Sequence, residues 1–298
     1  MRTDRVLAKA AATVVLGGVL AAAYLLVARP YQMRWGATAT EVDRPMPGDG
    51  LSHCPTFRAT RAVTIDGTPA DIWPWLVQMG YGRGGFYGYD ILENLGSARG
   101  LRSAATVSPD LQHLAVGDPL PLSAMGGLVV NAIAPLNHLV WAGQSGDYPG
   151  AFTWALYPLN AQQTRLVSRI QWSHHVSPPL AVAFDVFTEF TDGIAVRKIL
   201  QGVKDRVEGR VESFATQNVE FAVYVWALVS LSAALTMLLW RPLSVSTWLT
   251  ALGAGGAWLI VWYAPIAVST GALANLVVLW GLWRTLARSR TSTDAPPS

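Results

Sequence analysis

The sequence predicts an α+β protein in which an antiparallel sheet surrounds a long C-terminal helix, with about four transmembrane helices around that domain. Only 14% of the residues are charged, against about 25% in ordinary soluble domains. Residues 10–28 carry no charge, and residues 219–283 carry only Glu220 and Arg241. Because a bilayer core needs about 20 apolar residues per helix, both stretches are long enough to span it.

The first membrane helix is expected within an N-terminal segment, residues 1–29. Its apolar run is longer than the roughly 7–15 residues of a signal peptide, which favours a retained anchor over a cleaved one. Residues 217–287 contain three further apolar stretches, at 221–240, 245–263 and 267–283. Prolines separate them, at Arg241-Pro242 and at Pro265, because proline cannot extend a helix. The polar tail, residues 288–298, is expected to be disordered.

The seven basic residues outside positions 29–218 predict the orientation of the chain. Four spans place all of them on one side, which the positive-inside rule makes the cytoplasm. They are Arg2, Arg5, Lys9, Arg241, Arg284, Arg288 and Arg290. We therefore expect a multi-pass plasma-membrane protein with cytoplasmic termini and an extracytoplasmic central domain. Residues 29–218 hold 15 basic and 16 acidic residues, a balance of −1 that argues against nucleic-acid binding.

The central domain is expected over residues 56–216, after a linker at 30–55. Residues 58–65 are typical of a strand, and Asp66-Gly67 of a turn. Thr68, Pro69 and Asp71 then have the spacing of a capped helix start, and Pro74 predicts a kink. A short helix is expected near 90–95.

The second half of the domain has strand patterning followed by one long helix. A turn is expected at 116–119, and strands at 128–133, 139–142, 152–157 and 164–172, the last with alternating apolar and polar residues. After Pro178-Pro179, apolar residues recur every three to five positions from 182 to 214, which predicts one amphipathic helix.

Three blocks of sequence resemble a known superfamily. Residues 62–80 (AVTIDGTPADIWPWLVQMG) and 82–90 (GRGGFYGYD), with 197–204 (RKILQGVK) near the end, resemble the START-like, or polyketide cyclase/dehydrase-related (SRPBCC), superfamily. The resemblance covers about residues 57–213. It implies the helix-grip fold and a deep pocket for hydrophobic ligands, in proteins that range from lipid carriers to cyclases.

The glycine-rich loop after the first helix is one candidate for the ligand site. Gly80, Gly82 and Gly85 match a dinucleotide-binding fingerprint in spacing, but a helix and not a strand precedes them, which argues against nucleotide binding. A loop at the mouth of a pocket, gated by Arg83, Phe86 and Tyr87, is the better interpretation. A tight structural turn in which Arg83 pairs with Asp90 or Glu93 is the alternative. Asp90 and Glu93 are also weak candidates for an acid–base pair, although surface carboxylates give the same pattern.

Aromatic residues on the predicted strands are the second candidate. Trp141, Trp154, Trp172 and Tyr157 could line a ligand site, although aromatic residues at alternating positions are also ordinary core. The adjacent histidines 174 and 175 lack the spacing of a metal site, so no metal is expected. No cofactor is expected either, and the single cysteine, Cys54, excludes an internal disulfide.

The leading hypothesis is a membrane-anchored START-like domain that binds a lipid or another hydrophobic small molecule at the bilayer surface. The alternatives are a cyclase or dehydratase that acts on a hydrophobic substrate, and an envelope scaffold whose protein partners the sequence does not name. The enzyme requires at least two of Arg83, Tyr87, Asp90 and Glu93 to converge on the pocket.

Overall fold

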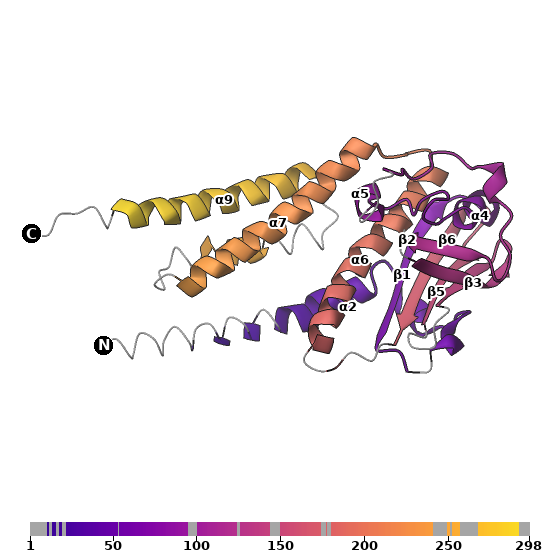
Figure 1. The fold of residues 1–298 in the computed structure, drawn as a ribbon, viewed down its shortest axis with the longest axis horizontal. Coiled ribbons are helices and arrows are strands. Elements are labelled where there is room, and N and C mark those ends of the chain that lie inside the picture. Colours follow the sequence, from indigo (N-terminus) through magenta and orange to yellow (C-terminus); the bar gives the residue numbers. More distant parts are fainter. Residues whose placement is uncertain are drawn as a thin grey trace, which may run out of the picture. The chain divides into compact units, whose positions relative to one another are not determined.

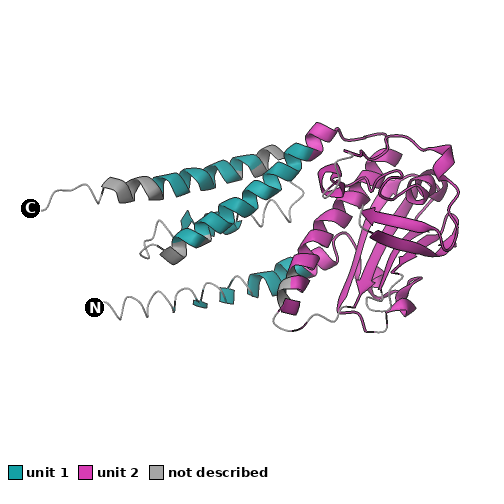
Figure 2. Cartoon of the chain, viewed as in Figure 1, with its two compact units in different colours: residues 1–29, 218–298 teal, residues 30–217 magenta. Residues whose placement is uncertain are grey.

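The computed structural model describes residues 11–291 apart from 12–13, 16–17, 20–21, 53, 95–99, 124–125, 144–149, 174–176, 178–179, 241–248, 251 and 257–267. The chain divides into two compact units (Figure 2). Unit 2 is Pro30–Gln217, and unit 1 combines Met1–Arg29 with Asn218–Ser298.

Unit 2 is built on a six-stranded sheet, which confirms the predicted α+β class and is consistent with a helix-grip arrangement (Figure 1). Its order is β1-β6-β5-β4-β3-β2, and each neighbouring pair is antiparallel. The strands are β1 (Phe57–Asp66), β2 (Pro119–Ser123), β3 (Gly126–Ala134), β4 (His138–Ala142), β5 (Gly150–Pro158) and β6 (Gln163–Trp172). Strand β2 was not predicted from the sequence, because its two prolines disfavour a strand. It lies at the edge of the sheet, where proline is tolerated.

One face of this sheet, called here the inner face, forms the core. Alternate residues of each strand point to it, as the period of two requires. The α-helix α6 (Leu180–Val207) packs against it with Val196, Ile199, Leu200 and Val203. The buried inner-face residues include Phe57, Ala59, Ile65, Leu120, Val130, Leu139, Trp141, Phe152, Trp154, Leu156, Leu166 and Ile170.

Helix α4 (Pro69–Val77) follows the first strand as predicted. The Asp71 carboxylate accepts the Thr68 backbone N–H at 2.8 Å, which is half of a capping box. Pro74 lies inside α4, and the short α5 (Asp90–Glu93) follows the glycine-rich loop.

The long helix ends earlier than predicted. α6 stops at Val207, and Gly209 has φ +73°, the left-handed conformation that ends helices. A new helix, α7 (Phe214–Trp240), begins where Ser213 Oγ accepts the Thr216 N–H at 3.1 Å. The apolar residues from 182 to 214, which were predicted to form one helix, therefore belong to more than one. Val211 and Phe214 lie outside α6.

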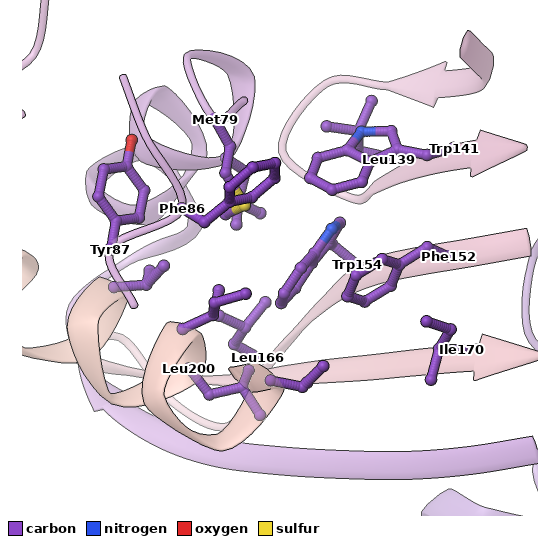
Figure 3. Close-up of a cluster of buried hydrophobic side chains, with 14 of the residues drawn as sticks. Met79, Phe86, Tyr87, Leu139, Trp141, Phe152, Trp154, Leu166, Ile170 and Leu200 are labelled. Atoms are coloured by element: carbon purple, nitrogen blue, oxygen red, sulfur yellow. The ribbon is translucent and has the colours of Figure 1, made fainter. Parts of the chain in front are cut away.

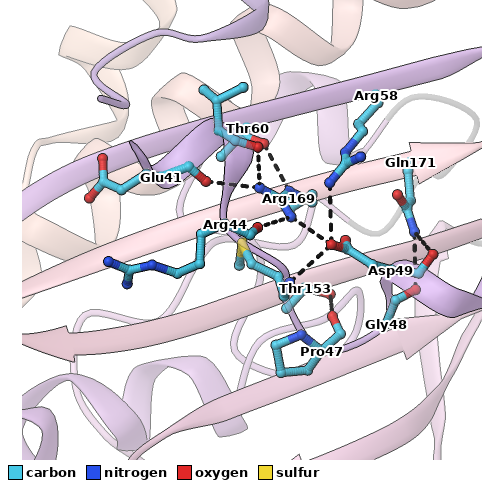
Figure 4. A network of polar contacts seen from close by, with 12 residues as sticks. Glu41, Arg44, Pro47, Gly48, Asp49, Arg58, Thr60, Thr153, Arg169 and Gln171 are labelled. Carbon is cyan, nitrogen blue, oxygen red and sulfur yellow. Dashed lines mark hydrogen bonds and ion pairs between the residues drawn. The ribbon is translucent and has the colours of Figure 1, made fainter. Parts of the chain in front are cut away.

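The described residues of the segment expected to be a linker, 30–55, are folded against both faces of the sheet. Gln32 and Met33 lie at the inner face, and the residues from Glu41 to Asp49 lie on the outer face. It contains α2 (Arg29–Met33), α3 (Ala39–Asp43) and the 3₁₀ turn η2 (Asp49–Leu51). Arg169 of β6 donates to the carbonyl oxygens of Glu41, Val42 and Arg44, each at 2.8 Å, and to the Asp49 carboxylate at 2.7 Å (Figure 4). Arg169 thus satisfies carbonyl oxygens at the C-terminal end of α3 and just after it, which have no partner within the helix.

Unit 1 contains α7 from Asn218 onward, the π-helical turn η1 (Tyr24–Ala28) and α9 (Val268–Thr291). Among the residues described, none of the helices combines the length and apolarity that crossing a bilayer requires. The four predicted transmembrane helices are therefore not supported by the structure. Most of the predicted span at 245–263 lies outside the described residues.

Candidate functional site

A cluster of aromatic side chains on the inner face is the strongest candidate site. Trp141 of β4 packs edge-on against Phe152 and Trp154 of β5, with ring centroids 5.4 and 5.7 Å apart (Figure 3). Phe152 and Trp154 stack on each other at 4.6 Å. Phe86, from the glycine-rich loop, reaches Trp141 at 6.3 Å. The structure therefore brings three predicted residues, Trp141, Trp154 and Phe86, together.

Both tryptophans in this cluster carry an unusual polar group. Their side chains are fully buried, and neither Nε1 has a hydrogen-bond partner among the described residues. A buried indole N–H normally finds an acceptor, and an unmade hydrogen bond of this kind costs about 1–3 kcal/mol. The cluster thus combines a large apolar surface with donors that lack acceptors, the composition of a small-molecule site.

Trp172 and Tyr157 lie apart from the cluster. Trp172 is at the end of β6 and stacks on Phe57 at 4.4 Å between ring centroids. Tyr157 points to the outer face, where it packs with Met46 and Ala62. Tyr157 cannot line the same site as Trp154, because odd and even positions of β5 face opposite sides.

The glycine-rich loop is a tight turn locked onto the core. Gly80 and Gly85 exchange main-chain hydrogen bonds at 3.1 and 3.0 Å, and both have positive φ. Arg83 does not pair with Asp90 or Glu93; its guanidinium donates to the carbonyl oxygens of Val77 and Leu111 at 3.2 Å. Helix α4 precedes the loop, so these glycines do not follow a strand as those of a dinucleotide fingerprint do.

Tyr87, which the sequence suggested as a gate of the pocket mouth, is buried behind this loop. Its hydroxyl donates to the Trp75 carbonyl oxygen at 2.9 Å, and its ring contacts Trp75 edge-on at 5.8 Å. The Arg206 guanidinium lies 4.4 Å from the ring centroid. Burial raises the pKa of the Tyr87 hydroxyl, so the residue stays neutral.

Asp90 and Glu93 also hold the loop in place. Asp90 Oδ1 accepts the Ser103 hydroxyl at 2.7 Å and the Ser103 N–H at 3.1 Å. Glu93 accepts the N–H groups of Phe86 at 3.1 Å and Gly88 at 3.3 Å. Burial, with a smaller contribution from the Asp90 charge, raises the pKa of Glu93 to about 7.

These carboxylates accept hydrogen bonds from backbone N–H groups of the loop and its neighbour Ser103, whereas the aromatic cluster lies on the sheet. A catalytic role for Asp90 and Glu93 stays a prediction, and the contacts observed are those of a structural clamp. The sequence analysis missed Arg206 of α6, which closes the clamp from the other side by donating to the Ala104 carbonyl oxygen at 2.7 Å. A basic residue in the last turn of a helix looks like an ordinary helix end, so no sequence signal marked it.

Residues 174 and 175, the paired histidines, lie outside the described residues. Within the part of the chain that the structure describes, no three His, Cys, Asp or Glu residues gather as a metal-ligand set. Cys54 is exposed.

Comparison with known proteins gives similarity at the level of solved structures. No family model matches the chain, and no curated protein matches it. One similar structure is CalC, a self-sacrificing resistance protein from Micromonospora echinospora, at 12% identity over 52% of this chain and 97% of that one, with a TM-score of 0.30. Another is the Polyketide_cyc-like protein Cgl2372 from Corynebacterium glutamicum, at 12% identity over 51% and 88%, with a TM-score of 0.24. The Aha1 dimer from Colwellia psychrerythraea matches at 15% over 52% and 98%, with a TM-score of 0.30. At these values the likenesses carry no argument about function.

Proposed function

We propose that this protein is a membrane-anchored domain that binds a lipid or another hydrophobic small molecule between the inner face of its sheet and α6. The observation that carries the proposal is the aromatic cluster of Trp141, Phe152 and Trp154 with its two buried indole N–H groups that lack a described acceptor. A ligand with an apolar body and an acceptor atom would cover the rings and complete these hydrogen bonds.

Membrane attachment rests on the sequence and on the surface of unit 1. Residues 10–28 carry no charge, and 219–283 carry only two charged residues. On α9, Leu276, Val277, Trp280 and Trp283 are all exposed. A contiguous apolar surface of this kind is typical of contact with lipid or protein. Attachment would keep the binding domain beside its source of ligand at high effective concentration.

Mass spectrometry of small molecules tests the binding proposal. The full chain is purified in lipid nanodiscs, extracted with organic solvent and compared with empty nanodiscs. We expect a defined hydrophobic compound that is enriched with the wild-type protein and depleted in a Trp141→Phe, Trp154→Phe variant, which keeps aromatic rings but loses both donors. Identical extracts from protein-loaded and empty nanodiscs would contradict the proposal.

The orientation of the domain has its own test, since the chain holds one cysteine and Cys54 is exposed. A membrane-impermeant maleimide added to intact protoplasts is expected to label Cys54, because the positive-inside rule places unit 2 outside. A Cys54→Ser, Ser298→Cys variant is the control and is expected to react only after lysis. Labelling of Cys54 only after lysis would reverse the orientation.

A further inference from the structure

A row of buried polar side chains crosses the inner face of the sheet beside the aromatic cluster. Arg61 of β1 lies opposite Ser168 of β6, and Ser168 lies opposite Trp154 of β5. Residues directly opposite on one face of an antiparallel pair have Cβ atoms about 4.5–5.5 Å apart, so these three side chains are neighbours. Their exposures are 1%, 1% and 0%.

Each member of the row has a polar atom without a hydrogen-bond partner in the described part of the chain. The atoms are Arg61 Nη2, Ser168 Oγ and Trp154 Nε1. Trp141 Nε1, on the neighbouring strand, also lacks a hydrogen-bond partner among the described residues. Buried polar atoms in folded proteins rarely lack partners, and one isolated exception would have little meaning. Four of them at adjacent positions on one face indicate a shared partner.

The charge of Arg61 restricts what that partner can be. Arg61 Nη1 is 2.6 Å from the Asp192 carboxylate of α6, and Arg61 Nε donates to the Gln32 carbonyl oxygen at 2.8 Å. The side chains of Arg61 and Asp192 are 1% and 7% exposed, so the ion pair is already balanced away from water. A carboxylate or phosphate on the ligand would leave an uncompensated negative charge in the core, which is strongly unfavourable.

The hydrogen-bonding capacity of the row restricts the partner further. Guanidinium and indole N–H groups donate only, whereas a serine hydroxyl can donate or accept. Three donors and one adaptable group therefore face the same region. A carbonyl oxygen, which has two lone pairs and no proton of its own, complements them better than a group that must also donate.

We infer that the ligand of the inner face is an uncharged, largely apolar molecule with a carbonyl oxygen that accepts one hydrogen bond from Ser168 and one from Trp154, beside the Arg61 guanidinium. This inference rests on the proposed function and names the chemical class of its ligand. The apolar part of the molecule lies against Trp141, Phe152 and Trp154, and the Arg61–Asp192 pair holds the guanidinium in position.

The inference is tested with a long-chain methyl ketone, 2-tridecanone labelled with ¹³C at the carbonyl, and the full chain in nanodiscs. A bound ketone gives a carbonyl resonance at higher frequency than the ketone dissolved in empty nanodiscs, because donated hydrogen bonds deshield the carbon. We expect unlabelled ketone to displace the bound signal, and dodecanoate and tridecane to displace it weakly.

Conservative variants locate the carbonyl. Ser168→Ala and Trp154→Phe each remove one hydrogen-bonding group. Each is expected to weaken ketone binding roughly 5- to 30-fold, which is the effect of losing the free energy of one or two hydrogen bonds. Tyr157→Phe is the matched control, because it changes an aromatic residue of the same strand on the outer face. Unchanged ketone affinity is expected there.

Several results would overturn the inference, and they distinguish its failure from the failure of the proposed function. If tridecane competes as well as the ketone, or if Ser168→Ala and Trp154→Phe bind the ketone as wild type does, an apolar site exists but carbonyl recognition is wrong. If dodecanoate binds more tightly than the ketone, the charge argument is wrong. If no apolar probe binds, the proposed function fails together with the inference.

Discussion

Replacement of Gly202 by alanine is expected to destabilise unit 2, although alanine is the better helix former. Gly202 lies within α6, where it passes against the glycine-rich loop. A Cβ atom at this position would stand 2.0 Å from the Tyr87 carbonyl oxygen and 2.8 Å from Tyr87 Cβ. Tyr87 cannot easily retreat, because it has φ +63° and is held by hydrogen bonds to Ser103 and Trp75.

The magnitude follows from these contacts. Overpacking of a closely packed region costs about 1–3 kcal/mol, and loss of the two Tyr87 hydrogen bonds adds about 1 kcal/mol each. The higher helix propensity of alanine offsets about 1 kcal/mol of this loss. The net loss is about 3 kcal/mol in the free energy of unfolding. A folding unit of this size loses about 2–4 °C in Tm per kcal/mol, so Tm falls by about 6–12 °C.

The assay is thermal unfolding of the full chain followed by near-ultraviolet circular dichroism, which reports on the buried tryptophans. Gly193→Ala is the matched control on the same helix, because the three atoms nearest to the added Cβ, at 2.5–2.7 Å, belong to the side chain of Gln32 and not to a backbone. We expect the free energy of unfolding of that variant to lie within about 1 kcal/mol of the wild-type value, because the higher helix propensity of alanine offsets the cost of displacing the Gln32 side chain. A Gly202→Ala protein as stable as Gly193→Ala would refute the close approach of α6 to the loop.

Two further predictions concern the clamp and the outer face. The pKa of Glu93 is raised to about 7, above its unfolded value of 4.5, so the folded state favours the protonated acid and loses stability as pH rises from about 5 to about 8. Relative to wild type, Glu93→Gln is therefore expected to gain stability over that range in chemical denaturation, and a difference independent of pH would contradict the buried position of the carboxylate. Arg169→Met is expected to destabilise the fold by about 3 kcal/mol or more and to open residues 36–51 to limited proteolysis, because it removes a buried cation that binds three carbonyl oxygens. Arg58→Met, which breaks an exposed ion pair with Asp49, is expected to cost at most about 1 kcal/mol, and equal proteolysis of both variants would contradict the structural role of Arg169.

Much of the central fold could be predicted from local patterns. The capping residues Thr68 and Asp71 fix the start of α4, and the alternation in β6 separates the buried Leu166 and Ile170 from the polar outer face. The end of α6 was mistaken, because the apolar spacing continues past Gly209 into the next helix. Residues 30–55 were taken as a linker because their order depends on distant side chains such as Arg169, and a local pattern cannot contain that information.

The candidate site was predictable only in its apolar part. Trp141 and Trp154 stand at strand positions that face inward, which the sequence pattern indicates. Arg61 and Ser168 interrupt the same inward-facing pattern, and this break is a signal that closer attention to the strand period would have found. The pairing of Arg61 with Asp192 joins residues far apart in the sequence, and only the fold brings them together.

Photolabelling of the site tests the central claim most directly. The full chain in nanodiscs is irradiated with a long-chain alkyl ketone that carries a diazirine, with and without excess 2-tridecanone, and the labelled residues are mapped by peptide mass spectrometry. We expect competitor-sensitive labels on inner-face residues, among them Phe152 and Trp154, and none on the outer-face residues Thr153 and Ala155 of the same strand. Labels that ignore the competitor, or that fall on the outer face or on unit 1 alone, would contradict ligand binding between the sheet and α6.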